Sequence, residues 1–349
     1  MFLYDKAVVK ADMDDLISRD IPFEKLKGKT VLVTGATGML AYYFTLGLMH
    51  LNKEKNYGIK VLALVRSKAK AEAKFAGFLN DENFEILAQD VCAPIDYEGD
   101  INYIFHAAGA ASPYFIKNDP TGIIAANTQG TVNILELARK KNIDNIVYPS
   151  TREIYGEVKD VDFVKETDMG SFDPLEARSC YPESKRMAET ILKSYLVQYG
   201  VPFTVLRIAH SYGPGMIIGN DGRVMADFIT NAVNSSDIVM KSDGLAERAF
   251  SYVTDAVAAI FLVMLKGANG EAYNLANETE PMAIRDVAQL ISDLFPERNI
   301  KVVYEVSTDT SGYCNYVRKG LNTEKLEALG WKPTVLLKDG LKSTVLSFD

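Results

Sequence analysis

The sequence predicts an α/β protein built on a Rossmann-type, doubly wound parallel sheet, with a smaller lobe at its C-terminal end. Short apolar runs alternate with helical stretches over residues 30–208, and this alternation is typical of a parallel sheet covered by helices on both faces. The runs lack a regular apolar–polar alternation, as expected for strands buried on both faces. After Gly213-Pro214-Gly215 the pattern becomes irregular, which indicates the smaller lobe.

The elements follow from these runs in chain order. Residues 1–28 are a polar extension that we expect to be helical, and the sequence indicates no role for it. Residues 29–210 are expected to form the Rossmann domain, to which later segments return, and residues 211–349 mainly the second lobe. The expected strands are 30–33, 59–65, 84–87, 103–105, 146–148 and 204–208. The expected helices are 39–51, 122–141, 182–199, 223–234, 254–265, 284–294 and 323–329.

The composition of the 349 residues, with 48% hydrophobic and 24% charged side chains, is that of an ordinary globular protein. The formal net charge of −8 repels phosphate backbones, so we expect no nucleic-acid partner.

Cys92, Cys180 and Cys314 are too few and too scattered for a disulfide framework or a zinc site. Acidic residues near the N-terminus argue against a signal peptide, and no apolar run approaches the roughly 20 residues of a membrane helix. We therefore expect a cytoplasmic protein without a metal or a membrane partner.

A glycine turn follows the first expected strand, in the sequence Thr34-Gly35-Ala36-Thr37-Gly38-Met39-Leu40-Ala41. Gly35 permits the tight turn, and Gly38 lets a diphosphate approach the backbone where the helix begins. Ala41 is small enough for that helix to lie close to the sheet. Because the turn stands between a strand and a helix, it predicts a dinucleotide site. The contacts expected from it are Gly35, Thr37, Gly38, Met39 and Leu40.

The end of the second expected strand reads Val65-Arg66-Ser67-Lys68 and contains no acidic residue. A site for NAD usually has an Asp or Glu here to bind the ribose hydroxyls, whereas an Arg accommodates the 2′-phosphate of NADP. Arg66 therefore favours NADP on local chemistry. The alternative is an Arg66 that stacks on the adenine or lies in solvent.

The stretch Tyr181-Pro182-Glu183-Ser184-Lys185 begins the helix expected at 182–199. Its spacing brings Tyr181 and Lys185 to one helix face, one turn apart. A tyrosine with a pKa near 10 is a poor base, and we expect the ammonium, with a nearby nicotinamide ring, to lower that pKa. Tyr181 would then remove a hydroxyl proton while hydride leaves the same carbon. Ser150-Thr151 would supply a hydroxyl to hold the same substrate oxygen.

The glycine turn, Ser150-Thr151 at a strand end and the helix that begins with Tyr181 stand in the order that this chemistry requires. Further motifs match those of a known protein family. They are Asp90-Val91, His106-Ala107-Ala108-Gly109, Asn127-x-x-Gly130-Thr131 and Ser150-Thr151-Arg152-Glu153-Ile154-Tyr155-Gly156. With them the chain resembles an extended short-chain dehydrogenase/reductase of the NAD-dependent epimerase/dehydratase family, over nearly all of residues 29–346. The resemblance implies further cofactor contacts by Asp90, Val91, Ala107, Ala108, Tyr181 and Lys185.

Within this family the chain is most similar to the UDP-glucuronate decarboxylase (UDP-xylose synthase) group. The similarity lies in Arg178-Ser179-Cys180-Tyr181, Asn220-Asp221-Gly222-Arg223-Val224 and Arg248-Ala249-Phe250. It implies that Thr151, Glu153, Tyr181 and Lys185 are catalytic, and that His210, Arg223 and Arg248 bind the UDP-sugar. It also implies a homodimer formed through the helices after Gly122 and after Tyr181.

The reaction that the resemblance implies is redox-neutral. Tyr181 takes the proton of the sugar 4-hydroxyl while hydride moves from C4 to bound NAD. The resulting 4-keto uronic acid is a β-keto acid, so it loses CO2 before hydride returns to C4. Glu153 would help to position the ring and to manage a proton.

Three positions depart from this group: Arg66 replaces an acidic residue, His210 an asparagine, and Gly215 an arginine near the acidic sugar. A nucleotide-sugar 4-epimerase and an NADP-dependent keto-sugar reductase therefore remain open. A 4,6-dehydratase is disfavoured because Arg152-Glu153 stands where that subgroup has Asp-Glu. The non-enzyme alternative is an NAD(P)-binding regulatory protein, against which the intact Tyr181 and Lys185 argue.

Overall fold

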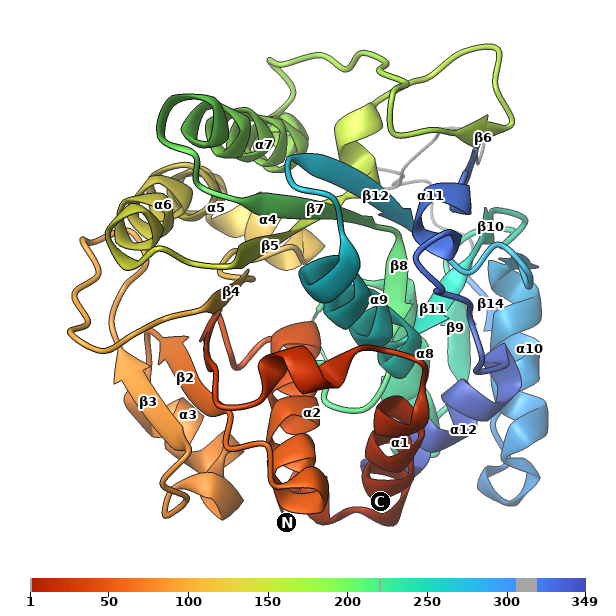
Figure 1. The fold of residues 1–349 in the computed structure, drawn as a ribbon. Coiled ribbons are helices and arrows are strands. Elements are labelled where there is room, and N and C mark those ends of the chain that lie inside the picture. Colours follow the sequence, from red (N-terminus) through yellow and green to blue (C-terminus); the bar gives the residue numbers. More distant parts are fainter. Residues whose placement is uncertain (1, 220, 306–318) are drawn as a thin grey trace.

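A computed structural model describes residues 2–219, 221–305 and 319–349, so Asn220 and Cys314 of the motifs above lie outside the described residues. Figure 1 shows a central sheet with helices against both faces, and the later part of the chain as a smaller lobe at one side. The predicted Rossmann-type α/β fold is thus confirmed. Among the described residues, no helix has both the length and the apolar character needed to cross a membrane.

The central sheet consists of seven parallel strands in the order β12-β7-β5-β4-β1-β2-β3. Six of them are the expected strands, with ends within three residues of the expected ones. The seventh, β12, has no counterpart among the expected strands and extends the sheet beyond β7 with residues from the second half of the chain. The strands are β1 Thr30–Thr34, β2 Lys60–Val65, β3 Phe84–Ala88, β4 Tyr103–His106, β5 Asn145–Thr151, β7 Phe203–Ile208 and β12 Glu271–Leu275.

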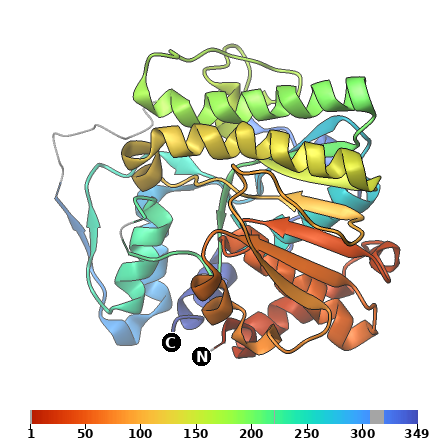
Figure 2. The same ribbon diagram turned by 90° about the vertical axis from the view of Figure 1, so that its left-hand side faces the viewer.

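Helices cover both faces of the sheet because alternate strand residues present apolar side chains to opposite sides. Leu32 belongs to the core that α6 and α7 cover, whereas Val31 and Val33 belong to the core under α2 and α9. Figure 2 shows α6 and α7 lying side by side along one face. These helices are α2 Met39–Lys55, α3 Lys68–Lys74, α4 Pro113–Asn118, α5 Pro120–Asn127, α6 Gln129–Lys141, α7 Cys180–Tyr199 and α9 Val253–Lys266.

The single helix expected over residues 122–141 is wrong, because two helices, α5 and α6, meet at Thr128. The Thr128 hydroxyl donates to the carbonyl oxygen of Ile124 at 2.8 Å, and such a bond competes with the helical backbone pattern. The pair also begins earlier than expected. Pro120 occupies the first turn of α5, and the Asp119 carboxylate accepts a hydrogen bond from the N–H of Gly122 at 3.1 Å.

The smaller lobe combines helices with two-stranded sheets. Its β8 follows directly on the end of β7, so the lobe lies next to the carboxyl edge of the central sheet. Its helices are α8 Val224–Val233, α10 Ile284–Leu294, α11 Glu324–Glu327 and α12 Leu337–Leu346, the last of which was not expected. The strand pairs are β8 His210–Tyr212 with β11 Phe250–Tyr252, β9 Ile238–Met240 with β14 Val302–Tyr304, β10 Glu247–Arg248 with β13 Met282–Ala283, and β6 Phe163–Val164 with β15 Gly320–Leu321.

The N-terminal extension contains α1 Ala7–Ser18, a helix that docks on α2 and α9. Val9, Met13 and Leu16 are fully buried at helical spacing, so the extension is less polar on one face than the sequence indicated. Gly47 allows the close approach of α1 and α2, because a Cβ at that position would lie 3.0 Å from Cδ2 of Leu16.

Candidate active site

The predicted cofactor and catalytic residues stand at the carboxyl ends of β1, β2, β3, β4 and β5 and in the first turns of α7. Parallel strands end at one common edge of the sheet, so side chains that follow different strands meet there. The smaller lobe adjoins the same edge (Figure 1).

The turn between β1 and α2 has no room for a side chain at Gly35. Gly35 has a φ of 61°, and a Cβ there would lie 2.7 Å from the carbonyl oxygen of Ala107 and 2.9 Å from Cα of Ala108. The N–H of Ala108 donates to Oγ1 of Thr34 at 3.0 Å. The structure therefore brings the glycine turn into contact with Ala107 and Ala108. Both segments were predicted to bind the same cofactor, so they need to lie together.

Helix α2 begins at Met39 with Gly38 as its N-cap, and no side chain caps it. The first N–H groups of this 17-residue helix can bind an anion, and the helix dipole favours negative charge at the same point. The carbonyl oxygen of Thr37 accepts a hydrogen bond from Nζ of Lys74 at 2.8 Å, which fixes the turn. The free N–H groups and the room at this turn thus fit the diphosphate of a dinucleotide, as predicted for Gly35 to Leu40.

Arg66 and Asp90 follow the neighbouring strands β2 and β3, and both side chains are exposed. Burial and the carboxylate of Asp90 raise the pKa of the Cys92 thiol, and the charge of Arg66 opposes them. Val91 is buried under α6, where a Cβ on Gly130 would lie 2.9 Å from its Cγ1. Arg66, Asp90 and Val91 thus border one region beyond these two strands.

Tyr181 lies in the first turn of α7 and is only 6% exposed. The hydroxyl of Thr151, the last residue of β5, is hydrogen-bonded to its phenol group. Ile116 and Ile123 pack against the tyrosine ring. The hydroxyl of Ser150 is buried and has no hydrogen-bond partner among the described residues. Thr151 and Tyr181 together form the hydroxyl pair that the sequence predicts.

In the protein alone the pKa of Tyr181 is raised, whereas we expected Lys185 to lower it. Burial is the largest cause and the Glu153 carboxylate adds to it, while the hydrogen bond with Thr151 and the charge of Arg178 act in the opposite direction. Burial also lowers the pKa of Lys185 to about 7. The lysine is therefore only partly charged at neutral pH, and the desolvation of the phenol dominates.

Lys185 lies between α7 and β5, and only 6% of the residue is exposed. Its Nζ donates to the carbonyl oxygen of Pro149 at 2.8 Å. The same Nζ lies 4.4 Å from the centre of the Tyr148 ring. Glu189, one turn further along α7, counteracts the effect of burial on the lysine pKa.

Glu153 completes the predicted catalytic cluster of Thr151, Tyr181 and Lys185 from the short 3-10 helix that follows β5. Its Oε1 pairs with Nη2 of Arg178 at 2.7 Å, and its N–H donates to Oγ1 of Thr151 at 3.2 Å. Burial raises the pKa of Glu153, while Arg178 and then Arg152 oppose that rise. The acid is therefore suited to exchange a proton closer to neutral pH than an exposed glutamate.

The three residues expected to bind substrate differ in how they are connected to this cluster. Arg223 pairs with the buried Asp221, and its charge reaches Tyr181, whose pKa it helps to lower against burial. His210 lies in β8 with its ring 5.7 Å from that of Phe250. Arg248 donates to the carbonyl oxygen of Glu247 at 2.7 Å, and within the described residues no hydrogen bond or ion pair joins it to the catalytic cluster.

Gly215, where the similar group has an arginine, lies against Leu3 of the N-terminal segment and Tyr42 of α2. A Cβ at this position would meet Cδ2 of Leu3 at 3.2 Å and the ring of Tyr42 at 3.5 Å. The N-terminal segment and α2 therefore occupy the space that a longer side chain would enter from the Gly215 backbone.

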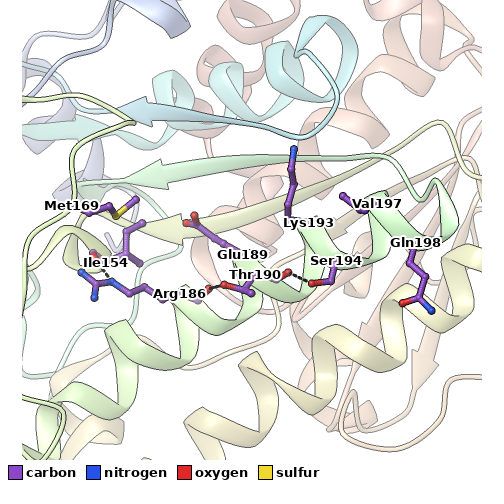
Figure 3. A pocket seen from close by; sticks show the side chains of 9 residues that line it. All are labelled: Ile154, Met169, Arg186, Glu189, Thr190, Lys193, Ser194, Val197 and Gln198. Atoms are coloured by element: carbon purple, nitrogen blue, oxygen red, sulfur yellow. Dashed lines mark hydrogen bonds between the residues drawn. The ribbon is translucent and has the colours of Figure 1, made fainter.

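A groove of about 700 Å³ is lined by none of the predicted site residues. Figure 3 shows its lining side chains along α7, on the side of the helix that faces the neighbouring strands. It is open and carries side chains of mixed character, which are Ile154, Met169, Arg186, Glu189, Thr190, Lys193, Ser194, Val197 and Gln198. The groove is therefore no part of the candidate active site.

Two residues of the site escape analysis of the sequence alone. Arg178 was noted only as part of a motif, although its position three residues before Tyr181 places it near the same end of α7. Tyr148 was noted only as a strand residue, and no local pattern signals that its ring lies under Lys185. Both depend on contacts between β5 and α7 that only the fold defines.

Comparison with known proteins agrees with this geometry. Residues 31–276 match the model of the NAD dependent epimerase/dehydratase family. UDP-glucuronic acid decarboxylase 6 from Arabidopsis thaliana is 32% identical over 312 residues, covering 89% of this chain and 86% of the relative. UDP-glucuronic acid decarboxylase 1 from Danio rerio is 34% identical over 322 residues, covering 92% of this chain and 72% of the relative.

Solved structures of lower identity share the fold. UDP-glucose 4-epimerase from Thermotoga maritima superposes with a TM-score of 0.74 at 24% identity, covering 91% of this chain and 98% of that one. UDP-glucuronic acid 4-epimerase from Bacillus cereus, solved with UDP-glucuronic acid and NAD, gives a TM-score of 0.74 at 20% identity and the same coverage. From the family match, the identity to the decarboxylases and the cofactor turn beside Tyr181 and Lys185, the chain belongs to the NAD dependent epimerase/dehydratase family of enzymes.

Proposed function

We propose that the protein decarboxylates a UDP-linked uronic acid, with UDP-glucuronate as its substrate, by transient oxidation at C4 of the sugar. The observation that carries this proposal is the set of arginines around the Glu153 carboxyl and the Tyr181 phenol. Arg152 and Arg178 act on Glu153, and Arg178 and Arg223 act on Tyr181. Arginines bind carboxylates well because their planar donors match the two oxygens, so this site suits an anionic sugar.

Tyr181 is the base for the 4-hydroxyl, and Thr151 holds the same oxygen through its hydroxyl group. Bound NAD supplies the hydride acceptor and donor at C4. Lys185, when protonated, stabilises the phenolate form of Tyr181 and so makes proton removal possible near neutral pH. The proton that Tyr181 takes from the 4-hydroxyl is returned to the same oxygen at the end of the cycle.

The 4-keto uronic acid loses CO2 because the electron pair of the C5–C6 bond passes into the enolate of the ketone. Thr151 and Tyr181 stabilise the developing negative charge on the C4 oxygen by hydrogen bonding. Glu153, whose pKa burial raises, then delivers a proton to C5. The products are CO2 and a UDP-pentose, with no net oxidation.

Dehydration is disfavoured because Arg152 precedes Glu153 where a second acid would be needed. Epimerisation requires the 4-keto sugar to turn over in the site and be reduced on its other face without loss of CO2. UDP-glucuronate distinguishes the outcomes, since decarboxylation gives a UDP-pentose and epimerisation gives another UDP-hexuronate.

The direct experiment is incubation of the purified protein with UDP-glucuronate, once with added NAD and once with NADP, followed by mass analysis of the nucleotide-sugars. We expect a UDP-pentose and an equal amount of CO2. Recovery of unchanged substrate with either cofactor would refute the decarboxylase proposal, and a UDP-hexuronate of changed configuration would establish the epimerase alternative.

We infer that Arg66 lets the cofactor site accept NADP besides the NAD that is typical of the family. Its exposed guanidinium follows β2 and, like Asp90 after β3, acts on the pKa of the Cys92 thiol. It can pair with a 2′-phosphate. Arg66→Asp should therefore weaken NADP binding about tenfold or more relative to NAD, as measured by fluorescence titration. Lys68→Asp is the control, because that lysine already lies near Glu72. An unchanged NADP-to-NAD ratio in the Arg66 variant would contradict this role.

We further infer that the protein is a homodimer formed through the outer faces of α5, α6 and α7. Met187 and Val197 on α7 and Ile124 on α5 are apolar and exposed, and neighbouring helices of this kind can pair with a second copy. Leu192 on α7 is fully buried, so it belongs to the core and not to this surface. The cytoplasmic location expected from the sequence stays a prediction.

A further inference from the structure

Tyr148 is a fully buried tyrosine at the centre of the site, and the proposed reaction leaves it without a role. It lies in β5, three residues before Thr151, and its strand runs beneath α7 (Figure 1). Its ring centre lies 4.4 Å from Nζ of Lys185. Since the proposed mechanism needs Lys185 as an ammonium, whatever holds that charge in a buried site bears on catalysis.

Lys185 has few groups that compensate for the burial of its charge. Its Nζ donates to one carbonyl oxygen, that of Pro149. Glu189 acts on it from one turn away, but its carboxylate is bound by Arg207 through two hydrogen bonds of 3.2 and 2.7 Å. Among the described residues, no carboxylate lies in ion-pair contact with Nζ of Lys185. The face of the Tyr148 ring is thus a main source of negative potential beside the ammonium.

The ring of Tyr148 is held in place by its surroundings. Its hydroxyl lies 3.5 Å from Oδ1 of Asn127, and Nδ2 of Asn127 donates to Oγ of Ser184, the residue before Lys185. The ring of His106 lies 5.7 Å from that of Tyr148 on the side of β4. The strand and the helix are therefore connected directly next to the ammonium.

The aromatic neighbours stay uncharged at neutral pH, so the ammonium meets neutral rings. Burial raises the pKa of Tyr148 well above its usual range. Burial lowers the pKa of His106 to about 3, and the charge of Lys185 contributes. The titratable groups facing Lys185 are thus Tyr148 and His106 from the sheet, and Tyr181 and Glu189 from α7.

We propose that Tyr148 is a positioning residue whose ring holds the Lys185 ammonium in its buried place beside Tyr181. This inference rests on the proposed role of Lys185 in catalysis. The ring favours the charged form of the lysine, and the neutral form gains nothing comparable from it. The ring face, and not the hydroxyl group, is the part of Tyr148 that acts on the lysine.

Two kinds of substitution separate the ring from the hydroxyl. Tyr148→Phe keeps the ring and removes only the hydroxyl, while Tyr148→Leu and Tyr148→Met remove the ring. Methionine is the second ring-free variant because its flexible side chain fills irregular space in a core. Thermal melting and circular dichroism show which variants keep the native fold.

The measurement is the titration of Lys185 by NMR in protein labelled with 13C at lysine Cε, with the resonance assigned by Lys185→Met. In the Phe variant the lysine should titrate as in the unchanged protein. In the ring-free variants the lysine pKa should fall by about one unit, a tenfold change in the proton-dissociation constant. The alkaline limb of the kcat profile should then move to lower pH by the same amount, because the active ammonium loses its proton earlier.

The titration needs no substrate, so it decides the inference independently of the proposed function. A folded Leu or Met variant whose Lys185 titrates as in the unchanged protein would overturn the inference. A Phe variant that shifts as far as these variants would overturn it too, because the hydroxyl would then be the active part. If the titration shifts as expected but no variant or parent acts on UDP-glucuronate, the proposed function fails while the role of the ring stands.

Discussion

At the scale of single residues, the site depends on opposing effects of burial on two neighbouring side chains. Burial raises the pKa of Tyr181 and lowers that of Lys185 to about 7, so in the protein alone both groups are driven toward their neutral forms. Thr151, Arg178 and Arg223 counteract this for the tyrosine. In the protein alone the phenol of Tyr181 therefore stays protonated, and it can act as a base only when the charged form of Lys185 favours the phenolate.

Replacing Tyr181 by Phe should lower kcat by about a thousandfold, because the change removes the proton-transferring hydroxyl and leaves the ring in place. Cofactor affinity, measured by titration, should stay within about threefold of that of the unchanged protein, since the glycine turn is elsewhere. The matched control is Tyr195→Phe on the same helix, whose hydroxyl contacts Glu136 at 2.8 Å and which should keep its activity. A Tyr181→Phe variant with normal turnover would remove this residue from the mechanism.

At the scale of elements, α1 links α2, the helix that follows the glycine turn, to the second lobe. The Asp12 carboxylate accepts hydrogen bonds from the hydroxyls of Tyr43 in α2 at 2.6 Å and Tyr252 in β11 at 2.8 Å. Arg19, just after α1, pairs with the buried Asp255 of α9 at 2.8 Å. The extension is thus part of the folded core, although its sequence alone indicated no such role.

Asp12 should make the stability of this region depend on pH. Burial raises its pKa to about 6, against the hydrogen bonds from Tyr43 and Tyr252. Because the pKa of Asp12 is higher in the folded than in the unfolded state, protonation of Asp12 stabilises the fold, fully so below the unfolded-state pKa. This contribution to the free energy of unfolding is lost as the pH rises through about 6, and the loss is ~1 kcal/mol between pH 5 and pH 8. Asp12→Asn, which can still accept both hydrogen bonds, should lack this part of the dependence in denaturant unfolding. Asp20→Asn is the exposed control, and an equal pH dependence in both variants would contradict the role of Asp12.

At the scale of the whole molecule, the outer faces of α5, α6 and α7 form the proposed dimer surface. Met187 is 51% exposed on α7, near the catalytic turns of the same helix. Placing a charge there with Met187→Asp should convert the dimer to a monomer of 38.6 kDa, because an unpaired charge in an apolar interface is costly. Light scattering measures the mass, with Lys338→Asp on the exposed side of α12 as the control. A parent protein that is already a monomer would exclude the dimer.

The sequence predicted those parts of the fold and site that local patterns determine. The turn at Gly35 and Gly38 and the spacing of Tyr181 and Lys185 are set within a few residues, and six sheet strands could be located from their apolar runs. The break at Thr128, the ion pair of Arg178 with Glu153 and the ring of Tyr148 under Lys185 could not be predicted. Each depends on which elements become neighbours. The apolar face of α1 could likewise be recognised only from its packing on α2 and α9.

The central claim is that this site removes the carboxyl group of a UDP-linked uronic acid through a C4 oxidation that Tyr181 starts. The most direct measurement uses UDP-glucuronate labelled with 13C in the carboxyl group and follows the labelled CO2 together with the UDP-sugar product. Labelled CO2 and an unlabelled UDP-pentose should appear in equal amounts with the unchanged protein, and neither should appear with Tyr181→Phe. Retention of the label in a UDP-hexuronate, or its release at an equal rate by Tyr181→Phe, would contradict the account.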